Sequence, residues 1–359
     1  PHFMLKEIYE QPHAIQQTLI GRISEIEQSI KFDEGIEAVL NNNLTSITIV
    51  ACGTSFYAGL VGKYLIEHLA GIPTYLELAS EYRYFGIRDT TSLVIAITQS
   101  GETADTLGAL KEAKNIGCKT LVITNVVGST ATRIADASIL TQSGPEIGVA
   151  ATKTFTSQIL ILFLIALKLA LIKNKVGTDE ISRYISYLKV LPKGVRKVLE
   201  NSEDILKVAE KIKDSHSVFF IGRGINYPLS LEGALKLKEI SYIHAEGFPA
   251  GELKHGPFAL LTEKTPVVAI ITMDKTYDKM IANIGEVKAR KSPVIAIADE
   301  NDEEIEKYAD FVIRFPSNST PLSCIPIAVI LQLLAYHTAN LRGCEIDKPR
   351  NLAKSVTVE

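Results

Sequence analysis

The sequence contains two copies of one pattern, in which a continuous apolar run leads through a short loop and a helical stretch into a second apolar run. One copy begins at Leu93 and the other at Pro266, and they align without a gap, with Thr103 over Thr276. Continuous apolar strands are typical of parallel sheets that helices cover on both faces. The repeat therefore predicts two tandem βαβ domains.

A second pair of segments supports this organisation. Residues 47–59 and 217–230 both form apolar runs that enter loops of small residues, and they place Tyr57 over Tyr227. The offset between these two segments is about the same as the offset of the first pair. Both pairs are therefore expected to belong to one duplicated unit.

Helical patterns fill the rest of the chain. Residues 4–40 have the periodicity of helices that lead into the first domain. Residues 177–213 predict amphipathic helices that are broken near Pro192–Gly194 and join the two halves. A final apolar helix is expected to end at Gly343, a plausible C-terminal cap.

The expected fold is α/β, with two tandem domains that each hold a parallel sheet between helices, in a flavodoxin-like three-layer arrangement. An extended C-terminal tail follows them. The expected parts are a helical lead-in at residues 1–36, a first domain at 37–176, connecting helices at 177–207, a second domain at 208–345 and the tail at 346–359.

Composition sets limits on function. The 359 residues include 46% hydrophobic and 22% charged residues with a net charge of −3, which is ordinary for a folded protein. Nothing in this balance favours nucleic acid or an anionic membrane, so an anion site has to be local. The four cysteines fit neither a zinc site nor a disulfide framework, which favours a cytoplasmic protein. The apolar run 159–172 carries Lys168 and predicts a buried helix.

The loop "TQSGETAD" follows the first strand of copy one. It offers Thr98, Gln99, Ser100 and Thr103, and Gly101 lets the backbone come close to a ligand. Ligands of parallel sheets bind at the carboxyl ends of strands, where a helix N-terminus favours an anion. The loop therefore predicts a phosphate site, to which the neighbouring loop "CGTS" could add Thr54 and Ser55.

An alternative is that Ser100 and Thr103 only cap the helix. The second copy argues against it, because Met273 stands over Ser100 and Asp274 over Gly101. The serine and the glycine are therefore not needed to build this turn. A dinucleotide site is excluded because "GRG" at 222–224 lacks the third glycine and the acidic residue, and no P-loop is present.

The second copy carries a charged cluster. Glu232, Lys236 and Glu239 lie on one face of a predicted helix, where a solvated ladder of ion pairs is the ordinary alternative. A glycine-rich loop follows, which carries the ionisable residues His244, Glu246, Glu252 and His255. Such a loop is a better functional candidate than a helix face.

A metal site is the first alternative for this loop. Glu252 and His255 have the spacing i, i+3, but there is one such pair and the carboxylate frame of a di-iron bundle is absent. No metal and no cofactor are therefore expected.

The aldose–ketose isomerisation of a sugar phosphate needs a phosphate site together with a Glu, a His and a Lys. One base moves a proton between C1 and C2, and a second group opens the ring. A lysine can also condense with the ketone to form an imine, which acidifies the adjacent C–H. The tail "DKPRNLAKSVTVE" offers Arg350 and Lys354. We expect it to be ordered, with Asp347–Pro349 turning it away from the last helix.

The chain resembles the isomerase part of the glutamine–fructose-6-phosphate aminotransferases, which consists of two tandem sugar isomerase (SIS) domains. The resemblance rests on "CGTS", "QSGETADT", "GPEIGVA", "EGALKLKEISYIHAE", "AGELKHGP" and "PRNLAKSVTVE", and it extends from residue 4 to the end. The departures are Thr98 and Ala151, where the family usually has serine. The hydroxyl survives at Thr98, whereas Ala151 is left out of the expected site.

The resemblance implies a role for each matching residue. Glu239 would shuttle the proton between C1 and C2, His255 would open the ring from the other subunit of a dimer, and Lys354 would form a Schiff base with C2 of fructose 6-phosphate. Lys236 and Arg350 would flank the site. The substrate-binding residues would be Thr54, Ser55, Thr98, Gln99, Ser100, Thr103 and the backbone of Val149 and Ala353.

The resemblance also implies partners and a product. The family's N-terminal glutaminase domain supplies ammonia, and its residues are absent here, so this chain is expected to be the isomerase part in the synthesis of glucosamine 6-phosphate and other hexosamines. Two alternatives stay open. One is a SIS module that only senses sugar phosphates, and the other is an enzyme that releases amines from ketosamine phosphates.

Overall fold

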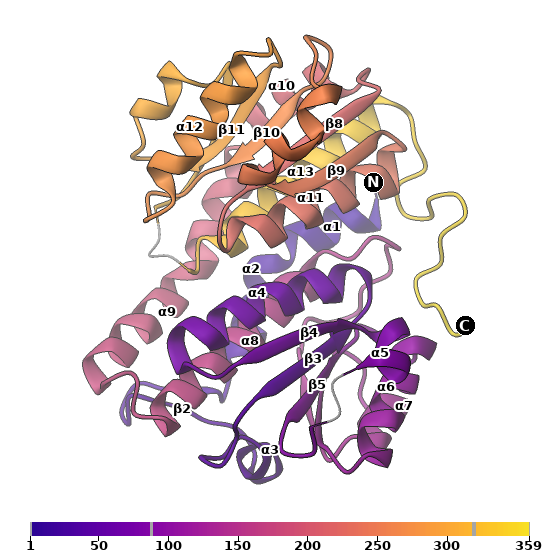
Figure 1. Cartoon of the computed structure of the whole chain (residues 1–359), viewed down its shortest axis with the longest axis vertical. Helices are drawn as coiled ribbons and strands as arrows, with labels where there is room; N and C mark the ends of the chain where they lie inside the picture. The colour runs from indigo at the N-terminus through magenta and orange to yellow at the C-terminus, as the bar shows by residue number, and fades with distance from the viewer. Residues whose placement is uncertain (1, 87–88, 318–320, 359) are drawn as a thin grey trace. The chain divides into compact units, whose positions relative to one another are not determined.

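The computed structural model describes residues 2–86, 89–317 and 321–358, and it divides them into two compact units. Unit 1 consists of residues 1–12, 147–152 and 190–352, and unit 2 consists of residues 13–146, 153–189 and 353–359. Figure 1 shows one sheet in each unit. Each unit consists of three segments that are separate in the sequence. The domain boundaries expected from the sequence, which are continuous ranges, therefore stay a prediction.

Unit 2 is built around a parallel sheet of five strands in the order β4-β3-β5-β6-β7. The strands are β3 (Ile47–Ala51), β4 (Thr74–Leu78), β5 (Leu93–Ile97), β6 (Lys119–Thr124) and β7 (Ala137–Leu140). Every residue of β3 and β5 is buried, as expected for central strands with both faces covered.

Helices cover both faces of this sheet. The long helices α4 (Gly53–Ala70) and α8 (Lys153–Ile172) lie on one side, and α5 (Ala79–Phe85), α6 (Ala104–Asn115) and α7 (Thr130–Ile134) lie on the other (Figure 1). Gly62 on α4 faces Leu162 on α8 so closely that an added Cβ would lie 2.8 Å from a Leu162 methyl carbon. This glycine is what lets the two helices pack tightly.

Unit 1 repeats the same topology. Its parallel sheet has the order β9-β8-β10-β11-β12, which matches unit 2 strand for strand. The strands are β8 (Ser217–Gly222), β9 (His244–Pro249), β10 (Val267–Ile270), β11 (Val294–Asp299) and β12 (Phe311–Phe315). Helix α12 (Tyr277–Lys288) follows β10 as α6 follows β5, with Thr276 and Thr103 as the two N-caps. The duplication predicted from the sequence is confirmed.

The other helices of unit 1 are α1 (Phe3–Tyr9), α10 (Glu203–Ile212), α11 (Asn226–Ser241) and α13 (Cys324–Leu341), and short turns of 3-10 helix are η1 (Ala250–His255), η2 (Pro257–Leu260) and η3 (Glu304–Lys307). Helix α13 packs along α11 and α10. Gly343 has φ +67 just after α13, and this confirms its predicted role at the helix end.

Two expectations for the connecting segments were wrong. Residues 4–40 are not all helical, because a short hairpin of β1 (Ile23–Ser24) and β2 (Ser29–Ile30) separates α2 (Gln11–Leu19) from α3 (Glu34–Val39). Helix α9 (Thr178–Glu200) runs through Pro192 without the expected break. Proline removes one backbone hydrogen bond of the helix. The helix is stabilised by buried apolar residues on both sides of the proline, among them Leu188 and Val195.

Helices α8 and α13 are long and apolar enough to cross a membrane by length and composition alone. In each, 83% of the apolar window is buried inside the folded chain. They are therefore core helices, and this confirms the buried helix predicted for residues 159–172.

Candidate active site

The predicted phosphate loop lies in unit 2 between β5 and α6. Thr98 is buried, and its Oγ1 lies 3.1 Å from Thr103 Oγ1 and accepts the Gly101 N–H at 3.3 Å. Ser100 Oγ accepts the Glu102 N–H at 3.1 Å. Gly101 has φ +71, and an added Cβ would lie 2.1 Å from Ser129 Oγ. The loop is therefore a tight ring of hydroxyls that admits no side chain at its turn, so the expectation that the glycine is not needed to build this turn was wrong.

Thr103 is the N-cap of α6, yet its side chain makes no capping hydrogen bond. Its hydroxyl is directed at Thr98 instead. The first N–H of α6, that of Ala104, donates to the carbonyl of Val356 in the C-terminal tail at 3.0 Å. The capping alternative for Thr103 is therefore wrong, because a distant segment of the chain caps this helix.

The acidic residue of this loop is directed away from the hydroxyls. Glu102 Oε1 accepts the N–H of Thr130 at 2.8 Å, at the start of α7. The hydrogen bonds from the Thr130 N–H and then from its hydroxyl hold the pKa of Glu102 below its usual value. The Glu102 carboxylate thus caps the N-terminus of α7. The hydroxyls of the loop remain suited to an anion.

Thr54 and Ser55 lie in the first turn of α4, which begins at Gly53 directly after the cap residue Cys52. The expected loop "CGTS" is therefore shorter than predicted, and its two hydroxyl residues are half-buried at a helix N-terminus. This position also favours an anion or a sugar hydroxyl.

The end of the tail belongs to unit 2. Ser355 Oγ lies 3.1 Å from Ser100 Oγ, so the tail contacts the phosphate loop directly. Lys354 is the preceding residue, and its Nζ lies 2.7 Å from Glu146 Oε2. The Lys354 side chain is 24% exposed, whereas the Glu146 side chain is fully buried. The structure therefore brings the predicted imine-forming lysine and the phosphate loop together in one unit.

The start of the tail belongs to unit 1 and is held there by specific contacts. The carboxylate of Asp347 accepts the N–H groups of Phe3 and Met4, each at 2.9 Å, and its carbonyl accepts the Val149 N–H at 3.0 Å. The chain bends at Asp347 as predicted. Because the N–H of Val149 is occupied, only its carbonyl is left for a sugar hydroxyl.

Arg350 and Ala353 complete this part of the tail. The N–H of Arg350 donates to the Tyr242 hydroxyl at 2.9 Å, and its guanidinium lies 4.2 Å from the centre of the same ring. Ala353 is exposed. The tail thus makes defined contacts along its length, as expected from the sequence, although it forms neither helix nor strand.

The charged cluster of α11 is buried in unit 1. Lys236 Nζ lies 2.5 Å from Glu239 Oε2 and 3.5 Å from Glu232 Oε1. The side chains of Lys236 and Glu232 are each 1% exposed, and that of Glu239 is 21% exposed. The solvated ladder is therefore wrong for this helix. Of the two carboxylates, Glu239 is the one that solvent and a substrate can reach.

The region after α11 differs from the predicted loop in one respect. Residues 244–249 form the edge strand β9, where His244 Nδ1 contacts Ser217 Oγ at 3.1 Å. Gly247 is required for packing, because an added Cβ would lie 2.7 Å from the carbonyl oxygen of Ser230 on α11. The loop proper begins at Ala250, and it exposes His255 at the end of η1.

No group of three His, Cys, Asp or Glu side chains is arranged to hold a metal ion among residues 2–86, 89–317 and 321–358. The residues predicted for catalysis and binding fall into two sets. Unit 1 holds Lys236, Glu239, His255, Arg350 and Val149, and unit 2 holds Thr54, Ser55, Thr98, Gln99, Ser100, Thr103, Ala353 and Lys354.

One residue of this region was missed in the sequence. Glu146 lies in the segment between β7 and α8, inside the stretch "GPEIGVA" that carries part of the resemblance. Its partner Lys354 is 208 residues away along the chain. The only sequence signal was an acidic residue placed between a Gly-Pro turn and an apolar segment.

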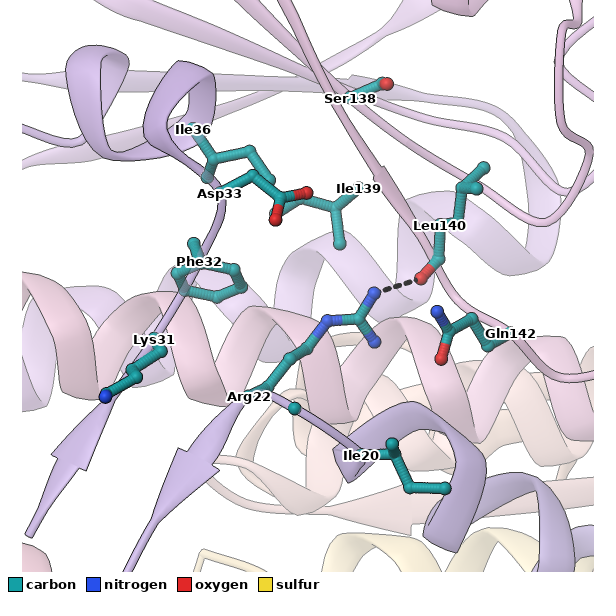
Figure 2. Close-up of a pocket in the computed structure, with 11 residues that line it drawn as sticks. Ile20, Arg22, Lys31, Phe32, Asp33, Ile36, Ser138, Ile139, Leu140 and Gln142 are labelled. Atoms are coloured by element: carbon teal, nitrogen blue, oxygen red, sulfur yellow. Dashed lines mark hydrogen bonds between the residues drawn. The ribbon is translucent and has the colours of Figure 1, made fainter.

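A cavity of about 360 Å³ in unit 2 contains none of the predicted site residues. Figure 2 shows Arg22 in this cavity with a hydrogen bond to the carbonyl of Leu140, at 2.6 Å. A second bond reaches the carbonyl of Thr18, also at 2.6 Å. Burial lowers the pKa of Arg22, and the nearby Asp33 opposes this shift. Since its guanidinium joins two segments of backbone, Arg22 has a structural role.

The family model described as the SIS domain matches residues 42–168 and 211–342. A glutamine–fructose-6-phosphate aminotransferase (isomerizing) from Methanosarcina acetivorans is 55% identical over 360 residues, and one from Thermococcus kodakarensis is 52% identical over 361 residues. The alignment covers 100% of this chain and 58% of each of these curated relatives.

A solved structure gives the same result for the fold. The C-terminal domain of glucosamine-fructose-6-phosphate aminotransferase from Francisella tularensis has a TM-score of 0.90 and 39% identity to this chain. The match covers 97% of this chain and 98% of that domain. The chain therefore belongs to the SIS domain family and, within it, to the glutamine–fructose-6-phosphate aminotransferases, of which it corresponds to the C-terminal isomerase part.

Proposed function

We propose that this chain converts fructose 6-phosphate by Schiff-base formation and ketose–aldose isomerisation, and that with ammonia the product is glucosamine 6-phosphate. The observation that carries the proposal is the contact between Ser100 and Ser355, at 3.1 Å between their hydroxyl oxygens. This contact supports the proposal because Lys354 is the residue before Ser355, so its backbone lies close to a loop of hydroxyls suited to phosphate. A sugar phosphate that reacts at its carbonyl needs both groups.

The phosphate is bound by unit 2. Thr98, Ser100 and Thr103 offer hydroxyls beside the N-terminus of α6, where the helix dipole favours a negative charge. Neutral donors hold the dianion without a competing ion pair. Gln99, Thr54 and Ser55 form hydrogen bonds with the phosphate and the sugar hydroxyls.

The chemistry at C1 and C2 is carried out by charged groups. Lys354 forms an imine with the C2 carbonyl, which makes the proton on C1 more acidic. Glu239 moves that proton between C1 and C2, and Lys236, buried beside it, keeps the carboxylate in place. Arg350, stacked on Tyr242, fixes the start of the tail.

Ring opening is assigned to His255, supplied by the other subunit of a homodimer. The support is that His255 is exposed on η1 rather than enclosed in its own unit. Ammonia comes from a glutaminase domain in the longer proteins of the family, since this chain spans 58% of the length of its curated relatives. All four cysteines are free thiols, which suits a cytoplasmic enzyme of hexosamine biosynthesis.

The test is to incubate the chain with fructose 6-phosphate and to follow the appearance of glucose 6-phosphate. We expect turnover by the wild type and none by Lys354→Arg or by a variant that lacks the last eight residues, and both variants should still unfold in a cooperative thermal transition. Arginine keeps the positive charge but cannot form an imine. A folded wild type that binds the sugar phosphate without turnover would identify a sensing module instead.

The same assay with a ketosamine phosphate separates the remaining alternative. Release of an amine from that substrate, without conversion of fructose 6-phosphate, would contradict the proposal. Conversion of fructose 6-phosphate alone would support it.

A further inference from the structure

Glu146 is the direct partner of the tail lysine. The distance from its Oε2 to Lys354 Nζ is 2.7 Å, and its side chain is fully buried while that of Lys354 is partly open to solvent. We propose that Glu146 is a further catalytic residue, which exchanges protons with Lys354 and balances the charge of the iminium. This inference rests on the proposed function and names a residue that the sequence did not single out.

The carboxylate is held rigidly. Thr154 donates its N–H to Glu146 Oε1 at 3.1 Å and its hydroxyl to Oε2 at 2.8 Å. Thr154 is the second residue of α8, a helix of 20 residues, so Glu146 lies at the positive end of the helix dipole. A buried carboxylate is stable when it is hydrogen-bonded and paired with a cation. Glu146 therefore gives the lysine of an irregular tail a fixed position.

The amine has to lose a proton before it can attack the C2 carbonyl. The ammonium of Lys354 gives one proton to Glu146, and the freed electron pair forms the bond from Nζ to C2 while the carbonyl electrons move to oxygen. That oxygen takes the proton back from Glu146 and becomes a hydroxyl. The geometry suits this exchange, because general acid–base groups act within hydrogen-bond distance of the proton they move.

The second half of the step uses the same pair. Nζ gives another proton to Glu146, the hydroxyl receives it and leaves as water, and the nitrogen electron pair closes the double bond to C2. The net change converts an ammonium and a ketone into an iminium and water, and Glu146 ends as a carboxylate. The Glu146 carboxylate therefore lies beside the Lys354 ammonium before the step and beside the iminium after it, and its charge stabilises the iminium.

The test traps the imine. Wild type and Glu146→Gln are mixed with fructose 6-phosphate and reduced with borohydride, and the modified Lys354 peptide is measured by mass spectrometry at several pH values, alongside kcat and KM. Glutamine keeps an oxygen for the donors of Thr154 but cannot take a proton. At neutral pH we expect trapping and kcat to fall about 100-fold, the lower range for loss of a general acid–base group.

The pH profile and KM separate catalysis from structure. We expect the rate of Glu146→Gln to rise with pH towards that of the wild type, since hydroxide can remove the proton, and KM to stay the same because the phosphate loop is intact. Glu146→Asp, which keeps a carboxylate, should regain part of the rate. As a matched control, Glu263→Gln removes an exposed carboxylate 3.4 Å from Lys291 Nζ and should change nothing.

Three outcomes would overturn the inference. Glu146→Gln could trap the imine at the wild-type rate. Its kcat could be lower than that of the wild type by the same factor at every pH. Its kcat could also be no lower than that of Glu146→Asp. If instead the wild type itself gives neither turnover nor a trapped imine, the proposed function fails, and this inference fails with it. The behaviour of the wild type therefore tells the two failures apart.

Discussion

The two copies of the strand–loop–helix unit connect the strand to the helix through loops of different backbone conformation, because φ is +71 at Gly101 whereas the aligned Asp274 does not have a positive φ. Between β10 and α12, Asp274 fills the loop, because its Oδ1 accepts the N–H and the hydroxyl of Thr276, each at 2.7 Å, and its Oδ2 accepts the Thr272 hydroxyl at 2.8 Å. Between β5 and α6, the corresponding residue is Gly101, which has no side chain. Copy two carries its own anion in Asp274, whereas in copy one we propose that the hydroxyls bind the phosphate of a substrate.

The segment that caps the helix also differs between the copies. Asp274 is two residues before the N-cap of α12, and its carboxylate accepts the N–H of that N-cap residue, Thr276, from within the same loop. The corresponding end of α6 receives the carbonyl of Val356 from the C-terminal tail. In copy one, the tail that caps the helix also carries Lys354. The comparison teaches that replacing a local cap by a distant one brings the tail that carries Lys354 to the loop that we propose as the phosphate site.

The largest effect is expected from giving copy one the residue of copy two. In Gly101→Asp, a carboxylate would lie among the hydroxyls that we propose to bind phosphate, and like charges in contact cost several kcal/mol. We expect binding of fructose 6-phosphate to weaken at least about 100-fold, since each 1.4 kcal/mol is tenfold in affinity. Isothermal titration calorimetry measures this directly.

Gly101→Asn is the matched control for this change. It imposes the same steric cost, since any Cβ here meets Ser129 Oγ and φ is +71, but it carries no charge. Asn and Asp tolerate this backbone region about equally. The difference between the two variants isolates repulsion, and equal losses would contradict the role of this loop as a phosphate site.

A smaller effect is expected from Ser100→Ala. The fold should survive, because copy two places Met273 at this position. One hydrogen bond to a charged group contributes about 1.5–3 kcal/mol, so we expect the dissociation constant of fructose 6-phosphate to rise at least about tenfold. Met273→Ala, at the corresponding and 60% exposed position, should leave it unchanged. A loss in both variants would show that the two loops do not differ as proposed.

The sequence predicted those parts of the fold that depend on periodicity and repetition. Buried strands such as β3 and β5 are continuous apolar runs, and Gly343 marks the end of α13 through its backbone conformation. Both features are local. The comparison of Gly101 with Asp274 also needed only the alignment of the two copies.

Features that depend on tertiary contacts could not be predicted. The pattern of Glu232, Lys236 and Glu239 fits an exposed ladder as well as a buried one, and the packing of α11 against α13, β8 and β9 makes it a buried one. The helix through Pro192 persists because its apolar residues are buried on both sides. The role that we propose for Glu146 depends on its contact with a residue 208 positions away, which no local pattern reveals.

The smallest effect tests copy two. Asp274→Ala removes a carboxylate that accepts three hydrogen bonds and serves the end of α12. We expect a loss of about 1–3 kcal/mol in the free energy of unfolding, the usual cost of leaving such donors without a partner, measured by urea denaturation. Asp214→Ala removes an exposed aspartate from the same unit and should lose less. The affinity for fructose 6-phosphate should stay the same in both variants. A weakened affinity in Asp274→Ala alone would mean that copy two takes part in binding phosphate, and the division of labour between the copies would then be wrong.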